Sequence, residues 1–455
     1  MDYRNEAKKH QQDLIKDLQG YVRCKSVYDE KSIGEGAPFG KGVKNALDYV
    51  YNLALKDGFE VKNHDGYCVE VTYGNQDETV MVLAHSDVVP EGEGWKYPPY
   101  GAEIHDGLMY GRGTSDDKGP GLTAYYALKI LKEHNVPLKR KIKIVFGGNE
   151  ESGSRCLHHY FVEEGNPAPT YGFTPDAEFP LIYGEKGILT YKYEGEYEDN
   201  LIESFESGTV PNAVPAECVM VLKKEVHLEK EFFEWMEKRH FKGEYEEKDG
   251  RTILKFHGKA SHGAFPEGGI NAFTMLLRFV DRYTDSALAH NFGYAFSCYY
   301  GSKIGIQHYS DPMGNLTMNV GIGRYDGHKY TIIINIRYPN DMSGDMISKI
   351  LDAKIIHKGG MVSDSKPLYV DPSSPLVSTL MKIYREESGK MDAEPITIGG
   401  GTYARETQNV VAFGMDFLRG NGTGNIHDAN EALNLKDLED GLVIYLRALE
   451  ELANL

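Results

Sequence analysis

The stretch VMVLAHSDVVP, residues 80–90, joins an apolar run to a histidine and an aspartate, and it gives the first indication of the fold. Its apolar run, residues 80–84, is typical of a strand buried on both faces. His85 and Asp87 follow two positions apart, so they share one face of the chain at a spacing of about 6–7 Å. Open α/β sheets bind ligands at this end of their strands. A polar turn after the strand is the alternative that this stretch alone leaves open.

The surrounding segments alternate between helical and strand patterns. Apolar residues recur at helical spacing from Val43 to Lys56, and Gly58 fits a helix stop. Short strands are predicted in GFEVKN, CVEVTYG and TVMVLAH, followed by a helix over Leu122–Glu133 and a strand in KIKIVFGG. Helices that alternate with buried strands predict an α/β fold, with a mainly parallel sheet flanked by helices.

The pattern changes near Gly187. ILTYKYEG, TILKFHG and KYTIIINIRYP alternate as half-buried strands do, and a helical segment at 270–282 lies between them. Helical patterns return in SPLVSTLMKIYREES and LKDLEDGLVIYLRALEEL. We therefore expect a first domain built from residues 1–186 and 372–455, with an α+β domain inserted over residues 187–371. A chain of 455 residues is long enough for two cores.

Composition narrows the functional class. The net charge of −18 argues against a nucleic-acid or anionic-membrane partner, which would require a basic patch. Five scattered cysteines without a CxxC pair indicate reduced thiols in a cytoplasmic protein. The polar N-terminus does not look like a signal peptide, and no apolar run is long enough to cross a bilayer. We expect a cytoplasmic protein.

Further polar motifs could converge on the His85 strand end. GRGTSDDKGP places Asp116 beside Asp117, NEESGS places Glu150 beside Glu151, and two further segments carry Asp176 in TPDAEFP and His427 in GNGTGNIHDANE. Each motif alone could be a solvated loop, a helix N-cap or a structural histidine. Together they supply oxygen and imidazole ligands without cysteine, a set that suits Zn²⁺, Mn²⁺ or Co²⁺. Two such ions would need one carboxylate to bridge them.

Other catalytic signatures are missing. The sequence contains no G-x-S-x-G and no HExxH. GEGAPFGKG departs from a phosphate-binding loop, because Glu35 stands where glycine is needed and Gly42 replaces the serine or threonine.

Six parts of the sequence resemble motifs of the dinuclear metallopeptidases that include aminoacylase, carnosine dipeptidases and glutamate carboxypeptidases. They are HSDVVP, GRGTSDDKGP, NEESGS, TPDAEFP, SHGAFPEGG and the late histidine, His427. PFGKGVKNALDYV, VPNAVPAE and GGGTYAR make the chain similar to the bacterial PepV-type dipeptidases in particular. The similarity extends from about Phe39 to His427, with six motifs in the family's order.

The resemblance implies a role for each residue. Asp116 would bridge two ions, and His85 and Asp176 would complete one site. Glu151 and His427 would complete the other. Glu150 would be the general base, and Asp87 would orient His85. It also implies a cis bond between the two aspartates, with Asp117 directed toward Lys118 or the start of the next helix.

The inserted domain would be the family's lid. By the resemblance, His262 would stabilise the oxyanion, and Asn212 and Arg337 would hold the substrate. The backbone of Gly399–Thr402 and Arg405 are weaker candidates for that role. Read without the resemblance, His262 could sit in a turn and Arg337 could be an exposed charge on a strand. The long inserted segment favours a monomer.

The resemblance therefore implies a dipeptidase with two divalent ions, zinc in the first place and Mn²⁺ or Co²⁺ as alternatives. Its substrate would be a dipeptide with an unblocked N-terminus. An N-acyl-amino-acid deacylase or a succinyl-diaminopimelate desuccinylase would use the same chemistry. A non-catalytic metal- or peptide-binding protein would not need Glu150, and a purely structural protein would bind no metal.

Overall fold

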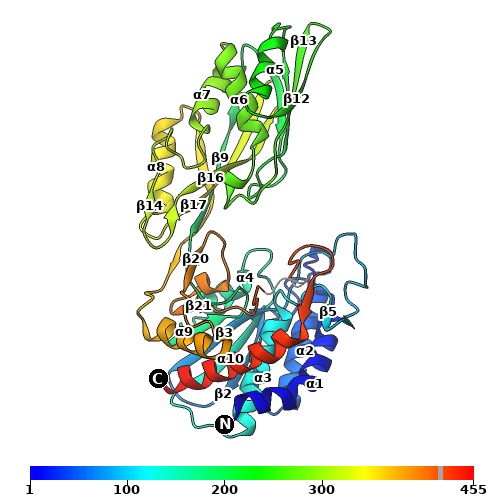
Figure 1. The fold of residues 1–455 in the computed structure, drawn as a ribbon, viewed down its shortest axis with the longest axis vertical. Helices are drawn as coiled ribbons and strands as arrows, with labels where there is room; N and C mark the ends of the chain where they lie inside the picture. Colours follow the sequence, from blue (N-terminus) through cyan, green and yellow to red (C-terminus); the bar gives the residue numbers. More distant parts are fainter. Residues whose placement is uncertain (419–423) are drawn as a thin grey trace. The chain divides into compact units, whose positions relative to one another are not determined.

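The computed structural model describes residues 1–418 and 424–455, and the chain forms two compact units (Figure 1). Unit 1 contains Met1–Tyr183, Val370–Ile396 and Gly401–Leu455, and unit 2 contains Gly184–Tyr369 and Thr397–Gly400. The division expected from the sequence differs most at residues 397–400, which belong to unit 2. There the carbonyl of Ile398 accepts a hydrogen bond from the Lys186 amide at 3.0 Å.

Unit 1 is built on a mixed sheet with parallel strands at its centre. The strands β6, β3, β7 and β21 pair in parallel. At the two sides of this central group, β1, β2 and β8 pair antiparallel with their neighbours. The α/β fold class is therefore confirmed. In sheet order the strands are β1 Glu60–His64, β2 Cys68–Tyr73, β6 Lys141–Gly147, β3 Thr79–His85, β7 Tyr171–Thr174, β21 Val410–Ala412 and β8 Ile182–Glu185, of which the last two residues belong to unit 2.

Helices pack on this sheet and on one another. Helices α3 and α10 contact β3 and β6, helix α2 contacts β1 and β2, and α10 also contacts α1 and α9. The helices are α1 Tyr3–Val22, α2 Lys41–Lys56, α3 Lys118–Glu133, α9 Pro375–Ser388 and α10 Leu435–Asn454. Shorter elements are η1 Glu30–Ser32, α4 Arg155–His158, η2 His159–Glu163 and η4 Tyr403–Glu406, with a small sheet of β22 Ala432–Asn434, β5 Leu108–Tyr110 and β4 Glu103–His105.

Two helix boundaries lie earlier than the sequence predicts. Helix α2 begins at Lys41 rather than Val43, and α3 begins at Lys118 rather than Leu122. The sequence was misleading because GPG follows Lys118, yet proline is tolerated in a first helical turn, where its missing N–H has no partner to lose. The predicted stop at Gly58 is confirmed by its left-handed φ of 71°.

Unit 2 is an antiparallel sheet covered by helices. Helix α6 contacts β11, β13 and β16, and α8 contacts β9 and β18. In sheet order the strands are β12 Lys242–Lys248, β13 Arg251–His257, β11 Glu217–Leu222, β10 Ile202–Ser207, β16 Thr317–Tyr325, β17 Lys329–Tyr338, β9 Gly187–Glu196 and β18 Gly359–Ser365. The helices are α5 Glu229–Glu237, α6 Ala272–Tyr283, α7 Ala287–Ala295 and α8 Gly344–Lys354. Short elements are η3 Pro266–Gly268, β14 Tyr309–Ser310, β15 Gly314–Asn315 and β19 Leu368–Tyr369, and β20 Ile396–Ile398 runs across the division between the units.

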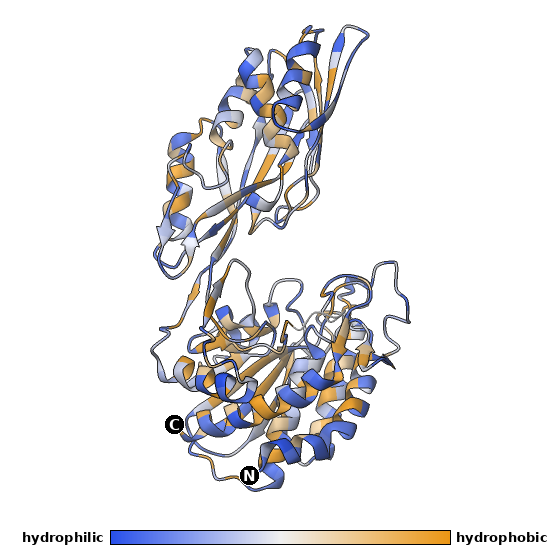
Figure 2. Ribbon diagram, in the orientation of Figure 1, coloured by the Kyte–Doolittle hydropathy of each residue, from blue (hydrophilic) through white to orange (hydrophobic). Residues whose placement is uncertain are grey.

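The two sheets bury their strands differently. Every residue of β3 is buried, whereas β9 alternates between buried and partly exposed residues along most of its length. In Figure 2 the central strands of unit 1 are mostly orange, and helices α1 and α10 carry both colours. A parallel strand between helices is apolar on both faces, while an antiparallel strand with one open face alternates. Within residues 1–418 and 424–455, no helix is long and apolar enough to cross a membrane.

Candidate metal centre

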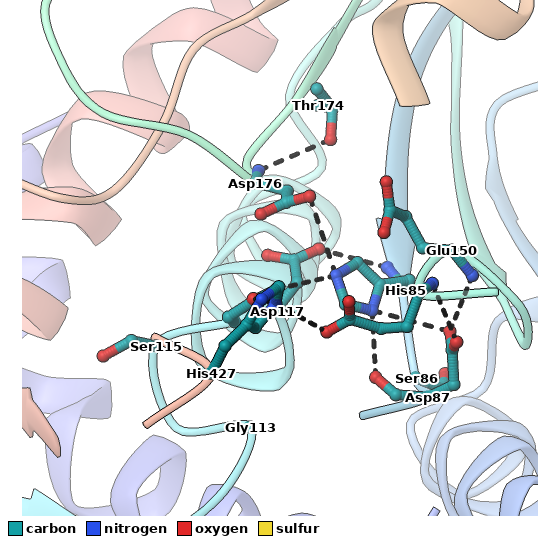
Figure 3. A network of polar contacts seen from close by, with 12 residues as sticks. His85, Ser86, Asp87, Gly113, Ser115, Asp117, Glu150, Thr174, Asp176 and His427 are labelled. Carbon is teal, nitrogen blue, oxygen red and sulfur yellow. Dashed lines mark hydrogen bonds and ion pairs between the residues drawn. The ribbon is translucent and has the colours of Figure 1, made fainter. Parts of the chain in front are cut away.

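His85 is the last residue of β3 and the middle of a cluster of polar side chains (Figure 3). Its ring is buried, with the residue 1% exposed. Its Nε2 lies 2.9 Å from Oδ1 of Asp116 and 3.6 Å from Oδ2 of Asp176. Asp176 follows β7, which pairs directly with β3, so the sheet itself brings these two residues to one edge.

Asp116 also faces a second group of side chains. Its Oδ2 lies 3.0 Å from Nε2 of His427, and that nitrogen lies 3.2 Å from Oε1 of Glu151. One ligand atom from each of His85, Asp116 and Asp176 falls within 4.8 Å of the others, and the same holds for Asp116, Glu151 and His427. The two groups therefore share Asp116, with one of its oxygens toward each histidine.

The loop that carries Asp116 has little room for side chains. The Asp116–Asp117 peptide bond is cis, as the resemblance implied. Gly113 has a φ of 88°, and a Cβ at Gly119 would lie 2.1 Å from the carbonyl oxygen of Thr114. Glycine is required at both positions, since other residues would meet a disfavoured backbone region or a clash.

The prediction for Asp117 is partly wrong. Asp117 precedes α3 as its N-cap residue, but its side chain forms no capping hydrogen bond. Its Oδ2 instead accepts the backbone N–H of His85 at 3.1 Å, and the side chain is fully buried. Nor does it pair with Lys118, whose ammonium donates to the carbonyls of Tyr21 and Cys24 at 3.3 and 2.7 Å. Asp117 therefore ties the end of β3 to the start of α3.

Asp87 contacts His85 mainly through its main chain. The Nδ1 of His85 lies 3.0 Å from the backbone carbonyl of Asp87 and 3.5 Å from its carboxylate. The carboxylate accepts the backbone N–H groups of Glu150 and Glu151 at 2.9 and 3.1 Å. Asp87 thus orients the histidine ring through its main chain and holds the loop of both glutamates through its side chain.

Negative charge is concentrated here. Burial raises the pKa of Glu150 well above its usual value, and the charges of Asp176 and Glu151 add to that shift. Burial also raises the pKa of Glu151 and Asp176. For Asp116, hydrogen bonds with His427 and His85 outweigh burial and hold its pKa low.

The histidines respond to the same charges. Hydrogen bonds to Asp116 and Glu151 raise the pKa of His427 to about 10. Burial opposes a charge on His85, but its contacts with Asp116, Asp176 and Asp87 raise its pKa well above the usual value. In both rings the nitrogen that faces the carboxylates lies where positive charge, from a proton or from a bound cation, is favoured. Nitrogen and oxygen donors crowded around unbalanced negative charge fit divalent metal ions.

The sequence did not reveal a buried ion pair beside the centre. Nη1 of Arg112 lies 2.8 Å from Oε2 of Glu431, and both side chains are almost inaccessible to solvent. Oε1 of Glu431 accepts backbone N–H groups of the Asp116 loop. Arg112 lies in GRGTSDD and Glu431 in HDANE, both within motifs quoted above. Their opposite charges were the one sequence feature that could have indicated the ion pair. Their 319-residue separation hid the pairing.

The predicted residues of unit 2 form a separate group. The Gly263 amide donates to the Asn212 carbonyl at 2.7 Å, and Ala213 bridges to His262, so the two loops are joined. The side-chain amide of Asn319 donates to the carbonyls on either side of Asn212, those of residues 211 and 213, at 3.0 and 2.8 Å. Asn319 of β16 therefore fixes the loop of Asn212, and with it the joined loop of His262.

Arg337 is buried rather than an exposed charge, with 4% of its surface accessible. Its Nε donates to Asn335 at 2.9 Å, and its Nη1 donates to the carbonyl of Gly399 at 2.8 Å. Gly399 and Gly400 therefore belong with this group in unit 2, whereas Arg405 lies in η4 of unit 1.

The fold and the centre define the class: an α/β protein with an inserted α+β unit and a pair of ligand groups that share one carboxylate. The sequence model of peptidase family M20/M25/M40 matches residues 81–451, and the chain belongs to this family.

Relatives agree with this assignment. The chain is 38% identical over 467 residues to the "Putative dipeptidase YtjP" of Bacillus subtilis (strain 168), covering 100% of both chains. It is 37% identical over 471 residues to a "Putative dipeptidase" of Staphylococcus epidermidis, covering 98% of each.

Solved structures share the fold at low sequence identity. Human carnosine dipeptidase 1 aligns with a TM-score of 0.59 at 15% identity, covering 100% of this chain and 98% of that one. The dipeptidase Dug1p of Saccharomyces cerevisiae aligns with a TM-score of 0.58 at 17% identity, covering 99% and 98%.

Proposed function

We propose that this protein is a metal-dependent dipeptidase of the PepV type with a dinuclear centre. The position of Asp116 carries the proposal, because its two carboxylate oxygens face two histidines that belong to two different ligand groups. A carboxylate in this position suits a bridge between two cations. The curated relatives named as putative dipeptidases support the choice of substrate class.

Two divalent ions would be held by residues already close together. His85 and Asp176 would complete one site with Asp116, and Glu151 and His427 would complete the other. When bound, such ions lower the pKa of a water molecule toward about 7 and polarise a carbonyl group. Zinc is our first choice, with Mn²⁺ and Co²⁺ as alternatives, since a set of nitrogen and oxygen ligands without cysteine accepts all three.

Glu150 is the proposed general base. Its raised pKa, caused first by burial, brings it closer to the range where a carboxylate can both accept and return a proton. Glu150 would take a proton from the attacking water as the water oxygen bonds to the peptide carbonyl carbon. It would then deliver that proton to the amine as the C–N bond breaks, releasing two amino acids. Asp87 would position it through the Glu150 N–H.

Unit 2 would supply the remaining contacts to substrate. Nδ1 of His262 accepts the Ala264 N–H at 3.2 Å, so a neutral ring carries its proton on Nε2. That N–H is the donor we assign to the oxyanion. Arg337 is proposed to hold the substrate carboxylate, since guanidinium groups bind carboxylates in a fork, and Asn212 to hold the backbone. We also propose that the protein is a monomer, which light scattering would measure.

Metal analysis combined with hydrolysis assays tests this function. Purified protein should contain two divalent ions per chain and should hydrolyse dipeptides faster than tripeptides or N-acyl amino acids. Dialysis against a chelator should abolish activity, and added metal should restore it. Asp116→Asn should lose metal and activity, whereas Asp106→Asn changes an exposed turn and should keep both. Metal-free protein with full activity would refute the proposal, and preference for N-acyl substrates would make it a deacylase.

A further inference from the structure

Glu431 is a buried carboxylate that none of the proposed chemical steps uses. It is 0% exposed, and it comes directly before β22, which pairs with β5. Its Oε1 accepts the backbone N–H groups of Gly113, Ser115 and Asp116 at 3.0, 2.9 and 3.2 Å. Its Oε2 accepts from Arg112 at 2.8 Å. Three donors therefore share Oε1 and one contacts Oε2, so both oxygens of the buried carboxylate have partners.

The main chain around Glu431 strengthens the same connection. The carbonyl of Glu431 accepts the Gly111 N–H at 3.0 Å, and the carbonyl of Ala432 accepts the Ser115 hydroxyl at 3.0 Å. The segment before β22 is therefore bound to the Asp116 loop along both its side chain and its backbone.

The same segment carries a proposed ligand. His427 stands four residues before Glu431, and the structure places its Nε2 3.0 Å from Asp116. The Glu431 carboxylate thus supports both residues of the contact between Asp116 and His427. It accepts the backbone N–H of Asp116, and it stands four residues after His427 in the same segment. His85 and Asp176 depend on other supports, namely β3, β7 and the carbonyl of Asp87.

We propose that Glu431 is a positioning residue that holds Asp116 and His427 in register, so that Asp116 can serve both ligand groups. The inference rests on the proposed metal centre and deepens it. Glu431 supports two ligands of one group, Asp116 and His427, but only Asp116 of the other group. Loss of Glu431 should therefore weaken the group that contains His427 more than the group that contains His85. A merely structural ion pair with Arg112 would destabilise the fold without this asymmetry.

Glu70 offers a matched control in the same unit. It is a buried glutamate, 8% exposed, whose Oε2 lies 2.9 Å from the ammonium of Lys143. Its other partners are the hydroxyls of Thr72 and Tyr160 and, at 3.9 Å, Nε2 of His64, and none belongs to the Asp116 loop. Glu70→Gln therefore removes a buried, paired charge without touching the centre.

Titration of metal-free protein with Mn²⁺, followed by calorimetry and electron paramagnetic resonance, tests the inference. Wild type and Glu70→Gln should bind two ions with a spin-coupled signal. Glu431→Gln should bind the first ion nearly as tightly and the second about 10–100-fold more weakly, the usual cost of losing a residue that orients ligands. When about one equivalent of Mn²⁺ has been added, the paramagnetic resonance spectrum of Glu431→Gln should show the signal of isolated Mn²⁺ ions.

Each outcome decides the inference. If Glu431→Gln binds two ions as tightly as Glu70→Gln, the positioning role is refuted while the metal centre stands. If it does not fold, Glu431→Asp keeps the buried negative charge but shortens the side chain and so draws it away from the N–H groups, and the second ion should again bind more weakly. Unchanged binding in that variant would overturn the inference. A wild type that binds fewer than two ions would refute the proposed centre itself, and this inference with it.

Discussion

The proposed metal centre of unit 1 and the residue group of unit 2 are built on opposite principles. In unit 1, charged side chains contact one another directly, as His427 does Asp116 and Glu151. In unit 2, the loops of His262 and Asn212 are held through backbone carbonyls and the neutral amide of Asn319. The first arrangement leaves negative charge that cations can balance. The second presents neutral or cationic donors, as binding an oxyanion or a carboxylate would require. The contrast fits the proposal that unit 1 binds metal and unit 2 contacts substrate, and four experiments test it.

The largest expected effect is in unit 1. Glu150→Gln keeps the side-chain shape but removes the proposed base, so kcat should fall by about 10²–10⁴-fold, the usual contribution of general base catalysis. Metal content should stay at the wild-type value, because Glu150 is outside both ligand groups. Steady-state kinetics with metal analysis measures both. Full activity would contradict the role of Glu150, and loss of metal would make it a ligand.

The next largest effect is in unit 2. His262→Ala should lower kcat by about 10²–10³-fold, since it removes a proposed oxyanion donor. The metal content of unit 1 should not change. Phe265→Ala, an exposed position three residues along the same loop, is the control and should retain most activity. If His262→Ala loses metal instead, the division between a metal-binding unit and a substrate-binding unit is wrong.

Buried cysteines report whether metal stabilises one unit selectively. Cys156 in unit 1 contacts the hydroxyl of Tyr403 at 2.9 Å, and Cys218 lies within the core of unit 2. In mild denaturant, Mn²⁺ at about 100 times its Kd should slow alkylation of Cys156 by about 100-fold, because a bound ligand stabilises the unit that holds it by about 2.7 kcal/mol. Alkylation of Cys218 should not change. Mass spectrometry of the labelled cysteines measures both, and equal protection would show that the units unfold together.

The smallest effect is a shift in titration within unit 2. Partial burial, and then the charge of Arg337, lower the pKa of His262 below its usual 6.5. Arg337→Gln should therefore raise this pKa toward 6.5, as NMR of the imidazole signals would show. The folded state binds fewer protons at this site than the unfolded state. The associated stability is present above pH 6.5 and is lost as pH falls through the lower folded pKa. An unchanged pKa in Arg337→Gln would remove Arg337 from the surroundings of His262.

Strong periodic patterns predicted the elements that position the centre. The uninterrupted apolar run before His85 predicted β3 because a strand covered on both faces has no polar side. The secondary structure of residues 201–250 was much harder to predict from the sequence. There β12, KGEYEEK, alternates exposed with half-buried residues and contains no fully buried side chain. An edge strand of this kind has a weak hydrophobic signal, so only its pairing with β13 identifies it.

Residue types and motifs alone indicated which residues could bind a metal. His85, Asp116, Glu151, Asp176 and His427 stand in separate motifs, and their nitrogen and oxygen donors indicated the ligand chemistry before any geometry was known. Local chemistry of this kind is carried by residue type, so it survives without a structure. Which backbone groups hold those residues in place is visible only in the folded structure. The carboxylate of Asp87 supports the glutamate loop, and Glu431 joins its own segment to one more than 300 residues earlier. Such contacts join buried groups that are distant in the chain, and burial makes them necessary because an unpaired polar group inside a protein is costly.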